Sequence, residues 1–206
     1  MAPSRRAEDP GPAALARNDR YLRDFVEALN LCPFAKRCRE EGRLVRRVIL
    51  DDYVLPALLR AAAEVETLPE KQCEVALFLV PGFTDGAAAF LELCAEVRRP
   101  LRHFHCVAFH PGLKADFSSE NRAVQFLRRA PDPTLQLVRI ATLERVRGER
   151  SGGTVYVPNP AAKDLHLPPS LSEEIARANL ATILEHGPAT LERLLQSFAA
   201  RQGDST

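Results

Sequence analysis

One stretch decides the fold prediction: His103-Phe104-His105-Cys106-Val107-Ala108-Phe109-His110-Pro111. It is a short apolar run with aromatic and β-branched residues, which predicts a buried β-strand, and Pro111-Gly112 ends it. Strand side chains alternate, so we expect His103 and His105 on one face of the sheet and His110 on the other. His110 also stands where the strand meets a loop, a position where open α/β sheets often bind ligands.

Two further apolar runs, at residues 44–50 and 74–80, predict strands that precede this one. Apolar residues at helical spacing follow each run, at 55–62 and 90–97, and predict a helix between successive strands. This order predicts an α/β fold: a small three-stranded sheet, mostly parallel or mixed, with flanking helices. A ferredoxin-like arrangement with antiparallel strand pairs is an alternative that periodicity does not exclude.

The remaining segments are predicted to be helices and loops. A helix is expected up to about Asn30, and the segment 134–147, which follows two prolines, is also predicted to be helical. The expected organisation is a disordered tail (residues 1–14), an α/β domain (15–147), a loop or lid (148–169) and a C-terminal helical pair packed on the domain (170–206).

Composition indicates a protein of the cytoplasm. The net charge of +1 predicts no general attraction to nucleic acid or to an anionic membrane. No run reaches the roughly 18 apolar residues that span a bilayer. The five cysteines are odd in number and show no CxxC spacing, which fits a reducing compartment better than a disulfide framework.

Cys32-Pro33 predicts a reactive thiol. Proline favours the first position of a helix, which would make Cys32 the residue that caps it. Unpaired backbone N–H groups and the positive end of a helix lower the pKa of a thiol. The alternative is that Cys32 is a small buried apolar residue in a tight turn.

The histidines also permit a metal site. His103 and His105 are separated by one residue, a spacing found in zinc and iron sites, and Cys32, Cys38 or His110 would complete the set of ligands. No helical HExxH pattern accompanies them. The alternative is that both are ordinary histidines of a strand that contacts a helix.

Three arginines are candidates for binding an anion. Arg46 lies in the first predicted strand, where an arginine without a partner is costly, and Arg129 and Arg139 flank a proline-containing segment. Planar guanidinium groups hold a carboxylate or phosphate through two hydrogen bonds, so inward-facing arginines predict a small anionic ligand. Internal ion pairs are the equally weighted alternative.

Several of these motifs occur together in one known family. The ordered elements are Leu31-Cys32-Pro33-Phe34-Ala35, Val45-Arg46, Phe109-His110-Pro111, and Arg129-Ala130-Pro131-Asp132-Pro133-Thr134-Leu135-Gln136-Leu137-Val138-Arg139. Over about residues 20–147 the chain resembles a bacterial family catalogued as domain of unknown function 1415. The resemblance implies a soluble bacterial protein and no particular reaction.

The chain departs from the pattern of that family at several positions. Arg128 stands in place of Asn, Asp132 in place of Tyr, Gln136 in place of His and Ile140 in place of Glu. If the activity of the family depends on that His and that Glu, it would be lost or altered in this chain.

Three functional hypotheses follow. The first is an enzyme that acts on a small anionic metabolite, with Cys32 as nucleophile or redox thiol, His110 as proton-transfer partner, and the three arginines as anion clamp. The second is a metal-binding protein with zinc or iron held by His103, His105, His110 and Cys32. The third is a non-catalytic subunit with a decayed site, which contacts a partner protein or a second copy through its C-terminal helices.

Overall fold

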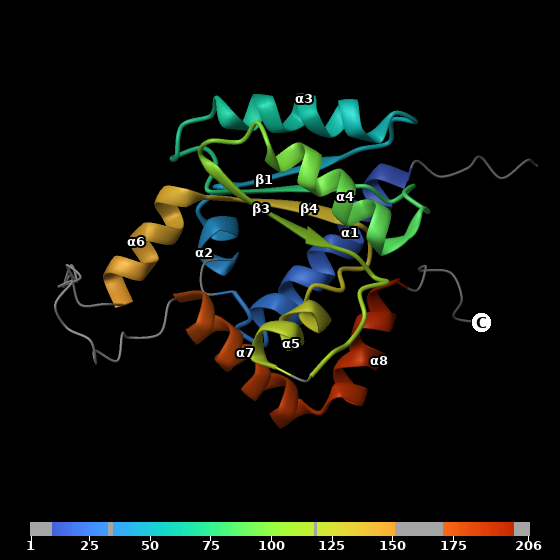
Figure 1. Cartoon of the computed structure of the whole chain (residues 1–206), viewed down its shortest axis with the longest axis vertical. Helices are drawn as coiled ribbons and strands as arrows, with labels where there is room; N and C mark the ends of the chain where they lie inside the picture. Colours follow the sequence, from blue (N-terminus) through green and yellow to red (C-terminus); the bar gives the residue numbers. More distant parts are fainter. Residues whose placement is uncertain (1–9, 33–34, 118, 151–170, 200–206) are drawn as a thin grey trace, which may run out of the picture.

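The computed structural model describes residues 10–32, 35–117, 119–150 and 171–199. This part of the chain contains one mixed sheet of four strands in the order β1-β2-β4-β3 (Figure 1). The strands are β1 (Leu44–Val48), β2 (Val75–Leu79), β3 (Phe104–Phe109) and β4 (Thr134–Arg139). β1 and β2 are parallel, whereas β4 lies between β2 and β3 and is antiparallel to both.

The predicted α/β class is confirmed, but the sheet has four strands where three were predicted. The error lies in the segment 134–147, which was predicted to be helical and is divided into strand β4 and helix α6 (Ile140–Arg150). Leu135 and Leu137 pack into the core on one side of the sheet, whereas Gln136 and Val138 face the other side, which is the two-residue period of a strand. The segment is extended because β4 pairs with β2 on one side and with β3 on the other.

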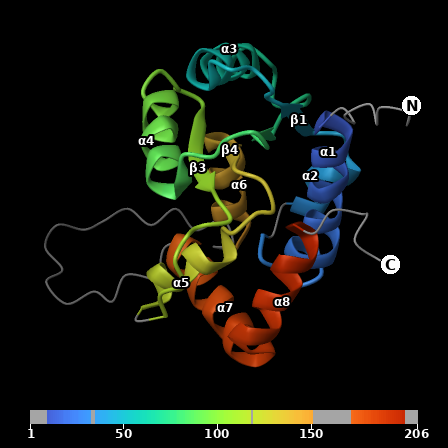
Figure 2. The same ribbon diagram turned by 90° about the vertical axis from the view of Figure 1, so that its right-hand side faces the viewer.

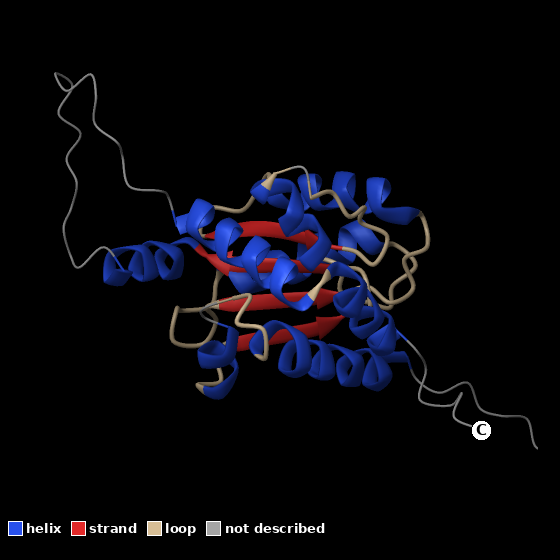
Figure 3. Cartoon of the chain, turned by 90° about the horizontal axis from the view of Figure 1, so that it is seen from below, coloured by secondary structure: helices blue, strands red, loops and turns tan. Residues whose placement is uncertain are grey.

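Helices cover both faces of the sheet, as Figures 1 and 2 show. One face carries α3 (Val54–Glu66) and α4 (Gly86–Arg98). The opposite face carries α1 (Pro10–Tyr21), η1 (Leu22–Glu27), α2 (Ala35–Glu40), α5 (Glu120–Leu127), α7 (Leu171–His186) and α8 (Pro188–Ala199). The view from below places the four strands side by side behind this second layer of helices (Figure 3).

Strand β2 divides the hydrophobic core into two clusters. All five of its residues are buried, as expected for a central strand covered on both faces. Val75, Leu77 and Leu79 belong to the cluster under α1, α5 and α8, and Ala76 and Phe78 belong to the cluster under α3 and α4. Side chains that follow one another along a strand therefore enter different cores.

The N-terminal helix is longer than predicted. α1 begins at Pro10, so residues 10–14 are helical although the sequence predicted a disordered tail there. Proline is tolerated in a first turn because its missing N–H would have no intrahelical acceptor. The helix continues without interruption into η1, a π-helical segment.

The C-terminal region forms two helices, α7 and α8, joined at Gly187. Gly187 has φ of +79°, a left-handed conformation that glycine adopts without steric cost. The predicted loop or lid at 148–169 overlaps the end of α6 as far as Arg150, and its remainder lies outside the described residues. Among the helices described, none combines the length and apolarity that crossing a membrane requires.

Candidate functional site

A cavity of about 460 Å³ lies between the sheet and the layer of helices that contains α1, α5 and α7. This volume falls within the roughly 300–1,000 Å³ typical of small-molecule sites. Most of its wall is apolar, with contributions from η1, β2, β3 and α5. The cavity is the best-formed candidate site in the described part of the chain.

The floor of the cavity consists of strand residues in three registered rows. The first row is Leu44, Val75, Val138 and His105; the second includes Leu77, Gln136 and Val107; the third includes Thr134 and Phe109. The first row crosses the whole sheet, so with adjacent strands about 4.8 Å apart it spans roughly 14 Å. Gln136 lies on the inner strand β4, near the centre of this floor.

Arg128 is the single charged side chain, apart from the titratable His105, among the described residues that line the cavity. It follows α5 directly, and its carbonyl oxygen accepts a 3.0 Å hydrogen bond from His110 N at the end of β3. Its guanidinium makes no hydrogen bond or ion pair within the described ranges. Burial lowers the pKa of Arg128, because the charged form loses hydration and gains no partner among the described residues.

Three carboxamides add polarity to the cavity wall: Asn18 on α1, Gln136 on β4 and Asn179 on α7. Asn18 is 2% exposed, and its Oδ1 has no hydrogen-bond partner in the described structure. Unpaired buried polar atoms are uncommon in proteins and each costs about 1–3 kcal/mol. These groups are therefore available to a bound molecule.

His105 lies on the edge strand β3, where it both lines the cavity and is exposed to solvent. It therefore forms part of the rim. Partial burial, with the positive charges of Arg98 and Arg128, lowers the pKa of His105 and favours its neutral form. A neutral imidazole at the rim can accept a proton or donate a hydrogen bond to a molecule in the cavity.

Cys32 also lines the cavity and packs against the core beneath α1. The described part of α2 begins at Ala35, and the predicted start at Pro33 lies outside the described residues. The backbone carbonyl of Cys32 accepts a 3.3 Å hydrogen bond from Ala35 N. The expected activation of Cys32 by a helix N-terminus stays a prediction.

His110 packs against the opposite face of the sheet from Cys32. Its ring lies 5.7 Å from that of Phe90 on α4, and its Nδ1 accepts a 2.9 Å hydrogen bond from Gly112 N. Burial lowers the pKa of His110. The structure does not bring Cys32 and His110 together, because odd and even positions near β3 face different cores.

The three predicted anion-binding arginines are held by groups of the protein itself. Arg46 forms a 2.5 Å ion pair with Asp19 on α1. Arg129 holds Glu192 on α8 with two nitrogens and donates to Pro111 O. Arg139 donates to the carbonyl oxygens of Cys73 and Leu68 and stacks on Phe104, with 4.4 Å from Cζ to the ring centroid. None of the three lines the cavity.

The predicted metal ligands are dispersed. His103 precedes β3 and therefore does not follow its alternation; its Nδ1 lies 2.6 Å from Glu66 at the end of α3. His105 faces the cavity, and His110 faces α4. Within the residues that the structure describes, no group of three or more His, Cys, Asp or Glu side chains is arranged to hold a metal ion.

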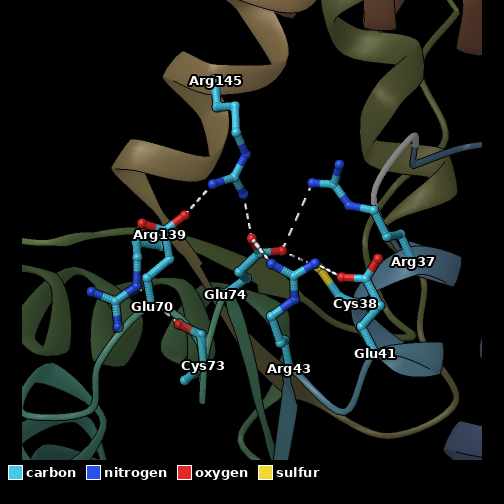
Figure 4. Close-up of polar contacts among 9 residues, drawn as sticks. All are labelled: Arg37, Cys38, Glu41, Arg43, Glu70, Cys73, Glu74, Arg139 and Arg145. Carbon is cyan, nitrogen blue, oxygen red and sulfur yellow. Dashed lines mark hydrogen bonds and ion pairs between the residues drawn. The ribbon is translucent and has the colours of Figure 1, made fainter.

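A buried ion-pair network beside the cavity was missed by the sequence analysis (Figure 4). Glu74, which directly precedes β2, is fully buried and contacts Arg43 at 2.8 Å, Arg145, and the Sγ of Cys38 at 3.0 Å. Arg37 approaches the same carboxylate at 3.9 Å. Burial opposes ionisation of Glu74, but the Cys38 hydrogen bond and the arginine charges together lower its pKa.

The network reaches the cavity through Cys38, which lines its wall. Burial, then the hydrogen bond to Glu74, raises the pKa of Cys38 to about 12, so this thiol stays protonated near neutral pH. The sequence did contain a signal for this network, because Glu74 stands at the start of an apolar run. A carboxylate buried there requires cationic partners.

Comparison with known proteins adds family membership to this description. No curated protein and no solved structure matches the chain. One family model does, over residues 13–159, which include the sheet and most of the cavity wall. The chain therefore belongs to the family described as protein of unknown function DUF1415.

Proposed function

We propose that this protein binds a small organic anion in the cavity, with Arg128 paired to the anionic group and the apolar walls around the rest of the ligand. One observation carries the proposal: the Arg128 guanidinium lines a largely apolar cavity and has no hydrogen bond or ion pair among the described residues. The ligand class agrees with the first sequence hypothesis, but the anchoring residue differs.

Electrostatics favours a ligand with one negative charge. Removing a cation from water is unfavourable unless an opposite charge and hydrogen bonds replace the lost hydration. A carboxylate can accept two parallel hydrogen bonds from a guanidinium and neutralise its single charge. A phosphate monoester carries about 1.5–2 negative charges near neutral pH, more than Arg128 alone would balance. A monocarboxylate is therefore the preferred class.

The proposal also identifies the groups that would act on a bound ligand. Cys32 and His105 line the same cavity as Arg128, whereas His110 does not. In the enzymatic form of the proposal, Cys32 is the candidate nucleophile or redox thiol, and His105 replaces His110 as the candidate proton-transfer group. The positioning of the anion by Arg128 is common to the binding and the enzymatic forms.

Calorimetric titration with matched small molecules tests the binding step. The probes are butyrate, octanoate and hydrocinnamate, with hydrocinnamide as the neutral counterpart of the last. We expect hydrocinnamate to bind roughly tenfold or more tightly than hydrocinnamide, because a charge-assisted hydrogen bond contributes about 1.5–3 kcal/mol. Arg128→Met should abolish this difference.

The neighbouring arginine provides the control. Arg129→Met removes a guanidinium outside the cavity and should leave the preference for the acid unchanged. Equal affinity for hydrocinnamate and hydrocinnamide, no binding of any of the three acids, or acid binding unaffected by Arg128→Met would each contradict the proposal. Tighter binding of phenyl phosphate than of hydrocinnamate would contradict the monocarboxylate assignment.

A further inference from the structure

We infer that the ligand carries, besides its anionic group, an uncharged hydrogen-bonding substituent that Gln136 contacts in the middle of the cavity floor. This inference deepens the proposed function and depends on it. The ligand class then narrows from organic acids in general to hydroxylated or similarly substituted acids.

The surroundings of Gln136 in the sheet provide no partner for its carboxamide. Its neighbours in the same row are Leu77 on β2 and Val107 on β3, both apolar. Along β4 the adjacent positions on the cavity face are Thr134 and Val138, and the hydroxyl of Thr134 already donates to Asp132 O at 2.8 Å. The Gln136 side chain makes no hydrogen bond with any residue in the described ranges.

The helices above the floor also place carboxamide side chains in the cavity wall. Asn18 and Asn179 are 2% and 6% exposed, and both line the cavity. No described residue hydrogen-bonds to either carboxamide, and Oδ1 of Asn18 is both buried and unpaired. Unpaired carboxamides therefore lie above and below the same space.

A carboxamide indicates a neutral partner. It offers two N–H donors and one carbonyl acceptor and bears no charge, so it complements a hydroxyl, carbonyl or amide rather than a second carboxylate. Water can hydrogen-bond Gln136 when no ligand is bound, but a purely apolar ligand that displaces this water would leave Gln136 unpaired. A site of this kind discriminates against analogues that lack the polar group.

Hydrocinnamate and its ortho-, meta- and para-hydroxy derivatives test the inference by calorimetry on the full chain. We expect at least one hydroxy isomer to bind about threefold to tenfold more tightly than hydrocinnamate, the range expected for one net hydrogen bond. Gln136→Leu should remove this preference while hydrocinnamate still binds. Gln125→Leu, an exposed glutamine on α5, is the matched control and should retain it.

The outcomes separate this inference from the proposed function. If no hydroxy isomer is preferred, or if the preference survives Gln136→Leu, the role of Gln136 is wrong although Arg128 can still bind the acid. If hydrocinnamide binds as well as hydrocinnamate, the proposed function itself fails. Circular dichroism verifies the fold of Gln136→Leu, and Gln136→Met gives the same test should the leucine variant not fold.

Discussion

Arg128 and Arg129 are adjacent in the chain but occupy opposite electrostatic environments. Arg129 holds Glu192 with two guanidinium nitrogens, donates to a backbone carbonyl, and lies 5.7 Å from the Phe126 ring centroid. Arg128 lines the cavity, and no carboxylate of the described residues pairs with it. One arginine therefore links the segment that follows α5 to Glu192 on α8, and the other leaves a charge available for a ligand.

This contrast predicts opposite effects on stability. Arg128→Met should leave the free energy of unfolding unchanged or raise it, because it removes a desolvated cation from an apolar wall. Arg129→Met should lower the free energy of unfolding by about 1–2 kcal/mol, because it breaks a partly buried ion pair. Urea denaturation without ligand measures both. A larger loss in Arg128→Met than in Arg129→Met would mean that Arg128 has a structural role.

Among the carboxylates of the described residues, we expect Glu74 to contribute most to the free energy of unfolding. Glu74→Gln should lower the free energy of unfolding by about 3–5 kcal/mol, because it leaves Arg43 and Arg145 without their buried counter-charge. Glu70→Gln is the matched control: Glu70 also pairs with Arg145 but is 37% exposed, so the loss should stay below about 1 kcal/mol. Similar losses in the two variants would show that burial does not govern this network.

Burial should protect most of the thiols from alkylation. It raises the pKa of Cys38 to about 12 and those of Cys73 and Cys106 to about 11, so little thiolate forms near neutral pH. Mass spectrometry after brief iodoacetamide treatment should show these three unmodified in the folded protein and modified in urea. Labelling of Cys38 at the rate of a free thiol in the folded state would contradict its place in the buried network.

Cys32 should behave differently because it lines the cavity. Alkylation at Cys32 should weaken hydrocinnamate binding, since the added group occupies space in the site. The matched control is Cys32→Ala, which should bind hydrocinnamate and become insensitive to iodoacetamide. Unchanged binding after complete modification of Cys32 would place the ligand elsewhere.

Acid should destabilise the protein through His105 and His110. Burial lowers the pKa of each below the ordinary value of 6.5, with Arg98 and Arg128 adding to the effect at His105. The unfolded chain then binds more protons than the folded one, so stability rises with pH and is lost as pH falls below about 6.5. Denaturant titrations between about pH 7.5 and 5 should show this slope.

Single substitutions separate the two histidines. His110→Gln and His105→Gln should each reduce the slope in this window, because each removes a group whose folded-state pKa is lowered. His186→Gln, at an exposed position on α7, is the control and should leave the slope as in the wild type. A slope that persists when both His105 and His110 are replaced would assign it to other groups.

The local pattern predicted three of the four strands because each is a short apolar run bounded by turn residues. It failed at β4, where Thr134–Arg139 follows two prolines and continues directly into α6. Short segments of mixed composition fit both helical and strand periods, and the choice between them depends on what they pack against. Since Gln136 was assigned to a helix, its place at the centre of the cavity floor was not predictable.

The sequence by itself determined the alternation along β3, which separates His105 from His110, because the pleat of a strand is a local property with a period of two. The tertiary structure alone decided which of the two histidines faces the cavity, since that depends on which helices cover each face. It also decided that other groups of the protein hold Arg46, Arg129 and Arg139, whereas the Arg128 guanidinium has no hydrogen bond or ion pair among the described residues. Long-range packing sets such pairings, and sequence spacing carries no information about them.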